Sequence, residues 1–390
     1  MDALKYEMLD ETRRGARIKV VGVGGGGSNA VGRMFEEGLE GVEFYVMNTD
    51  AQALSASRVP NKIQIGQRIT HGLGAGSDPQ IGREAALEDT ERILGILEGA
   101  DLVFVTAGLG GGTGAGASPV VATLAKQLDA LTIAVVTTPF SFEGGKRMRQ
   151  AERSVKDLAS SVDILTTIPN DRLLSIAPKG ASMSQAFRMA DDVLRQAVVG
   201  ISEIILTPGL INLDFSDIKA AISGMGHALI GNAVAKGPNA AVEAARAAIN
   251  SPLLEDTKIA GARQVLLNIT GSADIGIHQV NEACSIIREA AGNDDLQVNF
   301  GLIASEAMGD SVKVTIIATG FVQPEPVREP AIEVRSAAEF FAERPAEVVA
   351  APAASGPAAP SAPESTPAAA PVFEDELDVP AYLRKGKMLN

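Results

Sequence analysis

Two glycine-rich segments, each directly after a short apolar run, constrain this chain more than any other feature of its sequence. The first is GGGGSN at residues 24–29, which follows RIKVVGV at residues 17–23. The second is GLGGGTGAG at residues 108–116, which follows DLVFVTA at residues 101–107. Glycine lets the backbone approach a ligand closely, and exposed N–H groups at a helix N-terminus bind a phosphate without a basic side chain. The sequence therefore predicts a phosphate site built from two strand-to-helix turns.

The order of apolar patterns along the chain predicts the fold class. Short β-branched runs alternate with helix-like stretches, and we expect strands at residues 17–23, 42–48, 101–107, 131–137 and 163–168. This alternation favours an α/β protein with a parallel, Rossmann-type sheet, whose ligand site lies beyond the carboxyl ends of the strands. We assign residues 17–182 to this nucleotide-binding domain.

A long central helix and a second, smaller α/β domain are expected next. The helical period runs from residue 183 to residue 206, which is long enough to span one domain and join it to another. The second domain is placed at residues 207–321, where strands and helices mix again without another glycine-rich loop of this kind. It is therefore expected to lack a nucleotide site of its own.

The composition changes sharply after residue 321. The segment from residue 324 to residue 390 holds 11 of the chain's 20 prolines but two of its 40 glycines. We expect a flexible arm at residues 1–16 and a disordered linker at 322–373. Residues 374–390 regain apolar side chains between acidic and basic flanks, which is typical of a short docking peptide. A ragged terminus is the alternative interpretation of that last segment.

Charge and rare residues exclude several classes of protein. The formal net charge of −14 disfavours binding to nucleic acid, because the field repels a phosphate backbone. Cys284 is the single cysteine, and the three histidines are scattered, so neither an internal disulfide nor a histidine metal site is expected. With no secretory signal and no uninterrupted apolar span, we expect a cytoplasmic protein that does not insert into a membrane.

The first glycine segment alone leaves two nucleotide classes open. Gly22, Gly24 and Gly27 satisfy G-x-G-x-x-G, and Asp50 follows about 20 residues later, as in NAD-dependent oxidoreductases. The second segment favours a triphosphate instead, because two sets of backbone amides can hold it from both sides while Thr113 adds a hydroxyl donor. A third glycine segment at 72–77 is placed to close over the terminal phosphate. No G-x-x-x-x-G-K-[ST] motif occurs, which excludes a P-loop enzyme.

The motif GGGTGAG at residues 110–116 resembles the signature of the tubulin/FtsZ GTPase superfamily, although Ala115 replaces the usual Thr or Ser. Further motifs are similar to those of bacterial FtsZ and occur in the family order: GVGGGGSNA at 22–30, NTDAQAL at 48–54, GLGAGSDP at 72–79, PFSFEGGKR at 139–147, IPNDRLL at 168–174, NLDFSD at 212–217 and, in the tail, LDVPAYLR at 377–384. The resemblance covers residues 17–321 and the tail. It implies a tubulin-like fold with a GTPase domain, a central helix and a smaller GTPase-activating domain.

The resemblance assigns the nucleotide site residue by residue. It implies GTP or GDP bound with Mg²⁺ and held by Gly25, Gly26, Gly27, Ser28, Asn29, Gly111, Gly112, Thr113, Gly114, Glu143, Arg147 and Asn170. No residue of the chain is assigned as a metal ligand of its own. Glu143 and Arg147 suit the ribose and the neighbouring nucleotide atoms, although an ordinary surface ion pair is the alternative for two residues four apart.

Phe187 and Asp191 lie four residues apart on the long helix and so share one face, where they could bind the base of the nucleotide. The ring can stack on a purine, and the carboxylate can accept two hydrogen bonds from guanine N1–H and its amino group. Adenine offers no such pair of donors, so GTP is favoured over ATP. Without the resemblance, a core phenylalanine and a solvent-facing aspartate would be the default interpretation.

The resemblance implies a catalytic loop at Asn212, Asp214 and Asp217 that enters the pocket of the next subunit. Helix capping is the alternative role for Asn212 or Asp214. The family then implies head-to-tail protofilaments, hydrolysis that depends on assembly, and a cytokinetic ring at mid-cell on the inner face of the membrane. It also implies membrane-tethering and regulatory partners for residues 377–384. A filament that binds nucleotide without turning it over remains a competing hypothesis.

Overall fold

A computed structural model gives the fold and describes residues 15–178, 180–207, 209–211, 213–251, 259–293 and 295–321. The expected arm at 1–16, apart from its last two residues, lies outside the described residues. So do the expected linker at 322–373 and the docking peptide at 374–390. Among the residues described, no helix is both long and apolar enough to cross a membrane.

The first sheet has seven parallel strands in the order β3-β2-β1-β4-β5-β6-β7. Its strands are β1 (Ile18–Val23), β2 (Val42–Asn48), β3 (Asn61–Gln64), β4 (Leu102–Gly108), β5 (Leu131–Thr138), β6 (Ile164–Pro169) and β7 (Gly226–His227). The strand order reverses between β1 and β4, and parallel α/β sheets bind ligands at such a switch point. Both glycine-rich segments follow these two strands, so the topology places them side by side. The predicted parallel sheet is confirmed.

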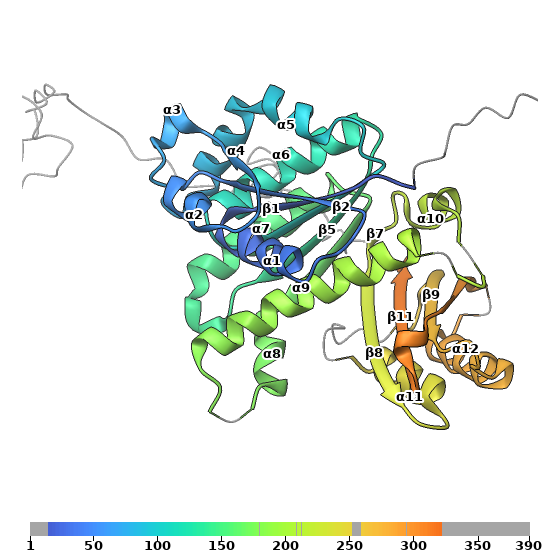
Figure 1. Cartoon of the computed structure of the whole chain (residues 1–390). Helices are drawn as coiled ribbons and strands as arrows, with labels where there is room; N and C mark the ends of the chain where they lie inside the picture. The colour runs from blue at the N-terminus through green and yellow to red at the C-terminus, as the bar shows by residue number, and fades with distance from the viewer. Residues whose placement is uncertain are drawn as a thin grey trace, which may run out of the picture. The chain divides into compact units, whose positions relative to one another are not determined.

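Helices cover both faces of this sheet (Figure 1). They are α1 (Gly24–Glu36), α2 (Ala51–Ala56), α3 (Gln67–Thr70), α4 (Pro79–Glu88), α5 (Thr90–Leu97), α6 (Thr113–Gln127), α7 (Gly145–Ala159) and α8 (Asn170–Ile176). Successive strand residues point to opposite faces. Val20 accordingly packs in the core with α1, whereas Val21 packs in the core with α4 to α7. Burial of both faces explains why these strands are predominantly apolar instead of alternating between apolar and polar residues.

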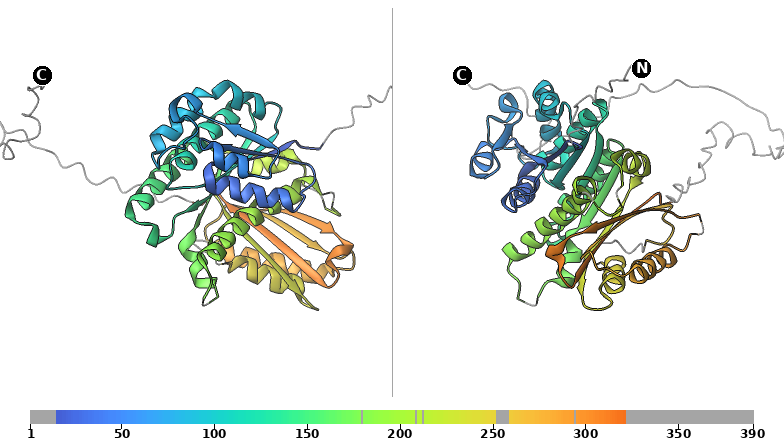
Figure 2. Two further views of the ribbon diagram at one scale, coloured as in Figure 1. Left: turned by 60° about the vertical axis from the view of Figure 1, so that its left-hand side comes forward. Right: turned by 45° about the vertical axis from the view of Figure 1, so that its right-hand side comes forward.

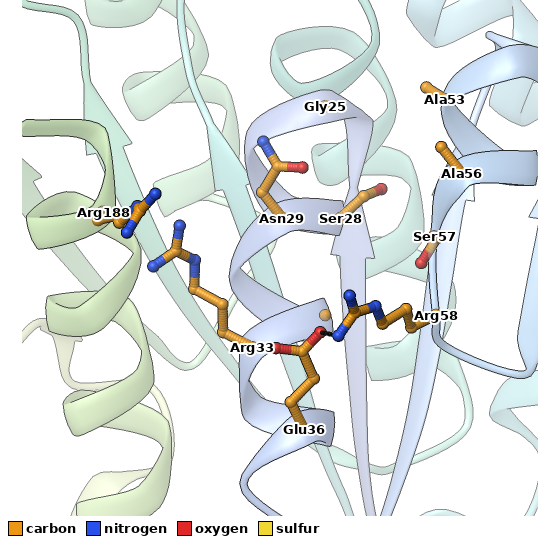
Figure 3. A pocket seen from close by; sticks show the side chains of 11 residues that line it. Gly25, Ser28, Asn29, Arg33, Glu36, Ala53, Ala56, Ser57, Arg58 and Arg188 are labelled. Atoms are coloured by element: carbon orange, nitrogen blue, oxygen red, sulfur yellow. Dashed lines mark hydrogen bonds and ion pairs between the residues drawn. The ribbon is translucent and has the colours of Figure 1, made fainter. Parts of the chain in front are cut away.

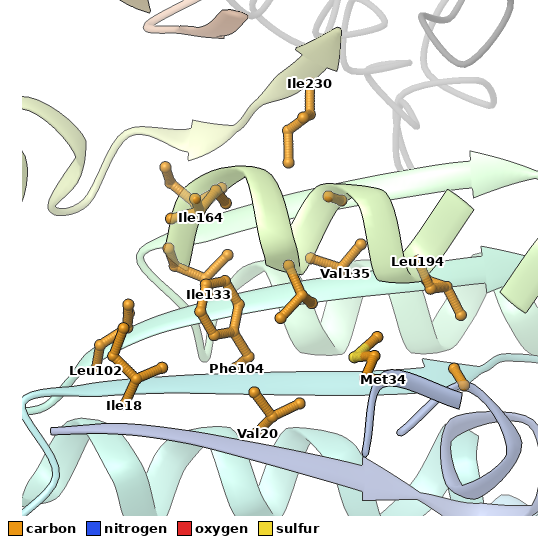
Figure 4. Packing of buried hydrophobic residues seen from close by; sticks show 14 of the residues in the cluster. Ile18, Val20, Met34, Leu102, Phe104, Ile133, Val135, Ile164, Leu194 and Ile230 are labelled. Carbon is orange, nitrogen blue, oxygen red and sulfur yellow. The ribbon is translucent and has the colours of Figure 1, made fainter. Parts of the chain in front are cut away.

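The long helix α9 (Met183–Leu206) lies between the two sheets of the protein (Figures 1 and 2). Leu194 of α9 packs with Phe104 and Ile133 of the first sheet in the core that Figure 4 shows. The same core includes Ile230 and Ile317 from the second sheet. The central helix is confirmed with the predicted bounds, and it joins the two parts of the fold through one continuous core.

The second sheet has four strands in the order β10-β9-β11-β8. They are β8 (Leu229–Lys236), β9 (Gln264–Gly271), β10 (Gln297–Ala304) and β11 (Ser311–Thr319), and β11 runs antiparallel to both neighbours. The helices α11 (Ala240–Ile249) and α12 (Ile277–Ala291) pack on this sheet in a separate core. A short helix, α10 (Phe215–Ile222), precedes β7. A second, smaller α/β domain is confirmed, but α10 and β7, which the sequence placed in it at 207–321, belong to the first sheet and its core.

Candidate nucleotide site

The first glycine-rich segment forms the first turns of a helix. The sequence predicted a strand-to-helix turn over residues 24–29, but α1 already begins at Gly24. The absence of side chains makes this early start possible: a Cβ at Gly27 would lie 2.2 Å from the carbonyl oxygen of Thr106. The first four N–H groups of a helix have no acceptor within it. The glycines therefore present unpaired donors at the carboxyl end of β1.

The second glycine-rich segment touches the first. Helix α6 begins at Thr113, and a Cβ at Gly24, which has φ of +71°, would lie 2.7 Å from the backbone nitrogen of Gly114. A Cβ at Gly26 would lie 3.2 Å from the Cα of Gly108. Two helix N-termini thus converge on one point, where their dipoles both favour an anion.

A cavity of about 290 Å³ lies where these segments meet. Eleven of the fourteen nucleotide residues assigned from the sequence line it: Gly25, Gly26, Gly111, Gly112, Thr113, Gly114, Glu143, Arg147, Asn170, Phe187 and Asp191. Leu109, Thr137, Pro139 and Leu194 also line it and were not foreseen. The lining residues lie between positions 25 and 194 and come from β4, β5 and five α-helices, α1, α6, α7, α8 and α9. The fold therefore brings together residues that are far apart in the sequence.

The other three assigned residues lie beside this cavity. Gly27 packs against Thr106 in the core, while Ser28 and Asn29 line an adjoining cleft of about 580 Å³ (Figure 3). The two hollows share Gly25. The Oγ atom of Ser28 is buried and has no hydrogen-bond partner among the described residues.

Thr113 is fixed by a second threonine. Its Oγ1 lies 2.7 Å from Oγ1 of Thr49, and either hydroxyl can donate. When Thr49 donates, the proton of Thr113 remains for another acceptor such as a phosphate oxygen. Thr49 itself follows β2, which places it beside the second glycine segment.

Polar side chains also line the cavity. Asn170 is 5% exposed, and its Oδ1 has no hydrogen-bond partner among the described residues. Buried amide oxygens are nearly always paired, so this atom is available to a bound ligand. Glu143 accepts a hydrogen bond from the Phe140 N–H at 3.0 Å and another from Arg147. Glu143 ends a 3₁₀ turn and Arg147 lies in α7, so the pair forms across a break between two helices.

Phe187 and Asp191 both face the cavity from α9. Phe187 remains 43% exposed and meets the ring of Phe140 edge-on, with 5.5 Å between centroids. Asp191 is buried and lies 3.1 Å from Nε of Arg33. Burial raises the pKa of Asp191 from 3.8 to about 6, although Arg33 acts in the opposite direction. This environment gives an open aromatic face beside a carboxylate acceptor.

Two arginines near this carboxylate were missed by the sequence reasoning. Arg33 from α1 and Arg188 from α9 extend into the space between these helices, on the side of the adjoining cleft (Figure 3). The spacing could have indicated them, because Arg33 lies four residues after Asn29 and Arg188 lies three before Asp191. Residues three or four apart lie on the same face of a helix. Across the same cleft, Arg58 pairs with Glu36.

The segment at 72–77, expected to close over the terminal phosphate, lies against the second glycine segment. Ala75 approaches Gly112, because a Cβ at Gly112 would lie 2.8 Å from the Cβ of Ala75. Leu73 pairs with Asp50 in an isolated bridge. None of the residues 72–77 lines the cavity as the structure describes it. Its role over a phosphate therefore stays a prediction.

The expected catalytic residues lie away from the cavity. Asp214 and Asp217 are exposed at the start of α10, and neither lines it. Asp214 occupies the N-cap position, but its side chain makes no capping hydrogen bond, which removes the simplest structural role for it. Asn212 lies outside the described residues. Among the described residues, no group of three or more His, Cys, Asp and Glu side chains is arranged to hold a metal ion.

A cavity at the switch point of a parallel sheet, between two glycine-lined helix N-termini, defines a Rossmann-type nucleotide-binding protein. The family model described as the tubulin/FtsZ family GTPase domain matches residues 17–178, and that of the FtsZ family C-terminal domain matches residues 226–322. The chain belongs to the FtsZ family within the tubulin/FtsZ superfamily. It is thus a GTP- and GDP-binding protein with the GTPase activity of that family, and the oxidoreductase alternative loses its support.

Solved structures agree with this assignment. An empty FtsZ dimer from M. jannaschii is 41% identical, covers 78% of this chain and 88% of its own, and superposes with a TM-score of 0.73. A mutant of FtsZ from the same organism is also 41% identical, covers 79% and 92%, and has a TM-score of 0.74. CetZ1 from Haloferax volcanii, bound to GDP, is 24% identical, covers 80% and 96%, and has a TM-score of 0.70, which shows a shared fold.

Proposed function

We propose that this protein hydrolyses GTP while it assembles head to tail into protofilaments, and that adjacent subunits complete each active site. The observation that carries the proposal is the separation of Asp214 and Asp217 from the nucleotide cavity. These exposed carboxylates make no side-chain cap. Among the described residues, the cavity lining holds two other carboxylates, and both are engaged: Glu143 is bound to Arg147, and Asp191 is buried and paired with Arg33.

The separation follows from the length of α9. Asp191 lies at the cavity, and Leu206, at the far end of the helix, leads into the loop before Asp214. At 1.5 Å per residue, the helix alone spans about 22 Å between these two residues. In Figure 1, α10 accordingly lies at the opposite edge of the first sheet from α2 and α3. One chain cannot bring both parts of such a site together, whereas a second copy stacked on the first can.

Exposed apolar side chains at both places support stacking. Leu73, Phe142, Leu174 and Met183 are 47–85% exposed on segments next to the cavity, and Phe142 stacks on Phe140. Leu210 and Ile211, 66% and 46% exposed, immediately precede the catalytic loop. Apolar side chains exposed beside a functional site are typical of a protein interface. The related structures described as an FtsZ dimer and as a CetZ2 protofilament agree with such an arrangement.

Each residue of the site has a defined task in this proposal. The α1 and α6 N-terminal amides and Thr113 hold the phosphates, Phe187 stacks on guanine, and Asp191 accepts from N1–H and the amino group. Mg²⁺ would neutralise the phosphate charge, bound mainly by the nucleotide and water, since no cluster of ligand side chains is present among the described residues. Asp214 and Asp217 of the next subunit position the attacking water.

We further propose the cellular role of bacterial FtsZ: a cytoplasmic polymer that forms the cytokinetic ring at mid-cell. Residues 377–384 would bind the membrane-tethering and regulatory proteins, and Pro380 would limit the conformations of that peptide before binding. The charge of −14 argues against nucleic acid as a partner. Binding of a peptide of residues 374–390 to division proteins, with a scrambled peptide as control, tests the partner role.

Phosphate release measured over a range of protein concentrations tests the enzymatic proposal. With GTP and Mg²⁺, the rate per subunit should rise above a threshold concentration and should stay negligible with ATP. A rate independent of concentration would indicate a site complete within one chain. Assembly without phosphate release would favour the competing hypothesis of a nucleotide-bound filament.

A further inference from the structure

A buried carboxylate ties the end of α10 to the first sheet. Asp163, 6% exposed, precedes β6 and so lies at the amino ends of the strands, whereas the glycine segments follow the carboxyl ends. Its Oδ2 accepts the N–H of Thr132 at 3.0 Å, and its Oδ1 accepts the N–H of Gly224 at 3.3 Å and the hydroxyl of Ser223 at 3.5 Å. Ser223 and Gly224 form the turn directly after α10. One side chain thus fixes that turn to β5.

Lys219 makes a second link from α10 to the amino-end side of the first sheet. The Nζ of Lys219 donates to the backbone oxygen of Asp129 at 3.0 Å and lies 3.1 Å from its carboxylate. Asp129 lies in the turn between α6 and β5 and has φ of +58°. A second lysine, Lys126 in the last turn of α6, makes a third link and lies 3.5 Å from Oδ1 of Asp163.

These links meet at the far end of the helix that starts at the phosphate cradle. Helix α6 begins at Thr113 in the cavity and ends at Gln127, beside Lys126 and Asp129. Helix α10 begins after Asp214 and carries Asp217 in its first turn. Asp214 and Asp217, which the proposal places in the pocket of the next subunit, are therefore linked through α10 to α6. The N-terminus of α6 lines this chain's own nucleotide cavity.

Apolar packing alone leaves the position of α10 under-determined. Only eight residues long, it buries Ile218, Ala221 and Ile222 in the core. Apolar contacts are non-directional and permit sliding or rotation, whereas hydrogen bonds to a charged group have a defined geometry. The polar links supply the restraint along and around the axis that the packing lacks.

We propose that Asp163, Lys126 and Lys219 are positioning residues for GTP hydrolysis, because they hold α10 so that Asp214 and Asp217 reach the γ-phosphate of the neighbouring subunit. The proposal rests on the shared active site proposed above. A misplacement of about 1 Å can lower a rate by about 100-fold, so even a small shift of α10 is costly. None of the three residues lines the nucleotide cavity, so binding of GTP should be independent of them.

The test compares turnover with binding in Lys219→Gln, a change at a partly exposed side chain that lies outside the apolar core. We expect turnover per subunit in the polymer to fall about tenfold, with the affinity of the monomer for GTP unchanged within twofold. Lys219→Arg keeps a donor of similar reach and should recover most of the rate. Asp163→Ala should behave like Lys219→Gln, and Lys156→Gln, in the exposed face of α7, is the matched control.

Mixed polymers of two variants test whether the defect lies in the loop of Asp214 and Asp217, which one subunit contributes to the pocket of the next. Asp217→Ala subunits offer intact pockets but an incomplete loop, so wild-type subunits added in equal amount should restore turnover at their shared contacts. Lys219→Gln subunits should restore it about tenfold less well. Equal restoration, or wild-type turnover in the Lys219→Gln polymer, would overturn the inference; so would a loss of GTP affinity as large as the loss of turnover. If instead wild-type turnover is independent of concentration, the shared site itself is wrong, which separates the two failures.

Discussion

The carboxylate proposed to read guanine is already engaged by an arginine from another helix: Arg33 Nε lies 3.1 Å from Asp191 Oδ2. Arg33 comes from α1, which also forms the phosphate cradle, and Asp191 comes from α9. The side chain of Asp191 is 12% exposed and that of Arg33 is 33% exposed. The ion pair therefore opposes the desolvation that burial imposes on Asp191.

GTP affinity should fall as the pH drops through about 6. Burial raises the pKa of Asp191 to about 6, and only the ionised carboxylate accepts from both guanine donors. Binding measured from pH 5 to pH 8 should show the loss, and Asp191→Asn should remove this pH dependence. Because the folded-state pKa exceeds the ordinary value of 3.8, Asp191 also lowers the free energy of unfolding, and so the stability, as the pH rises from 3.8 to about 6.

Replacing Asp191 by Ala should weaken GTP binding at pH 7.5 by at least about 100-fold, since a charged hydrogen-bond acceptor is lost, while ATP binding stays poor. Asp192→Ala is the matched control, because Asp192 is the next residue, more exposed, and pairs with Arg195. Titration of each variant with a fluorescent GTP analogue measures this. An unchanged affinity in Asp191→Ala would contradict the assignment of the base pocket.

Arg33→Ala should move the pH midpoint of GTP binding upward, because Arg33 is the cause that lowers the pKa of Asp191. Arg33→Lys keeps a cation beside Asp191 and should therefore shift the midpoint less. Arg58→Ala removes an arginine of the same cleft that pairs with Glu36 and serves as the control. A midpoint that stays in place in Arg33→Ala would show that the ion pair does not govern ionisation of Asp191.

Asp217→Ala should bind GTP normally but hydrolyse it at least about 100-fold more slowly, since a group that positions water in the transition state is lost. The carboxylate is exposed at the start of α10, so stability should be unaffected. Single-turnover phosphate release, with sedimentation to confirm assembly, is the measurement. Full turnover in assembled Asp217→Ala would refute its role.

Gly27→Ala should lower the free energy of unfolding by about 3 kcal/mol, because its Cβ would lie 2.2 Å from the Thr106 carbonyl oxygen and force the backbone apart. Gly25→Ala is the matched change in the same helix, where a Cβ meets no atom within 4 Å, and it should be neutral or slightly stabilising. Urea denaturation distinguishes them. Equal stability of the two variants would mean that α1 shifts without cost.

Much of the fold could be predicted because its signals are local. The strands β1, β2, β4, β5 and β6 are predominantly apolar and β-branched, and α9 keeps one helical period for 24 residues. The short strands β3 and β7 were not foreseen, since four and two residues carry too little pattern. They form because a neighbouring strand offers its unpaired backbone groups.

The sequence by itself determined the phosphate-binding half of the site, because a glycine-rich segment after a strand exposes backbone N–H groups in any tertiary arrangement. The other lining residues, Glu143, Arg147, Asn170, Phe187 and Asp191, were assigned through the family resemblance. Tertiary structure alone decided the start of α1 at Gly24, the pairing of Arg33 with Asp191, and the attachment of α10 to α6 through Asp163. Each of these depends on atoms from distant segments that meet only after the sheet has formed. No periodicity or motif encodes such a meeting, since it is set by strand order and close packing.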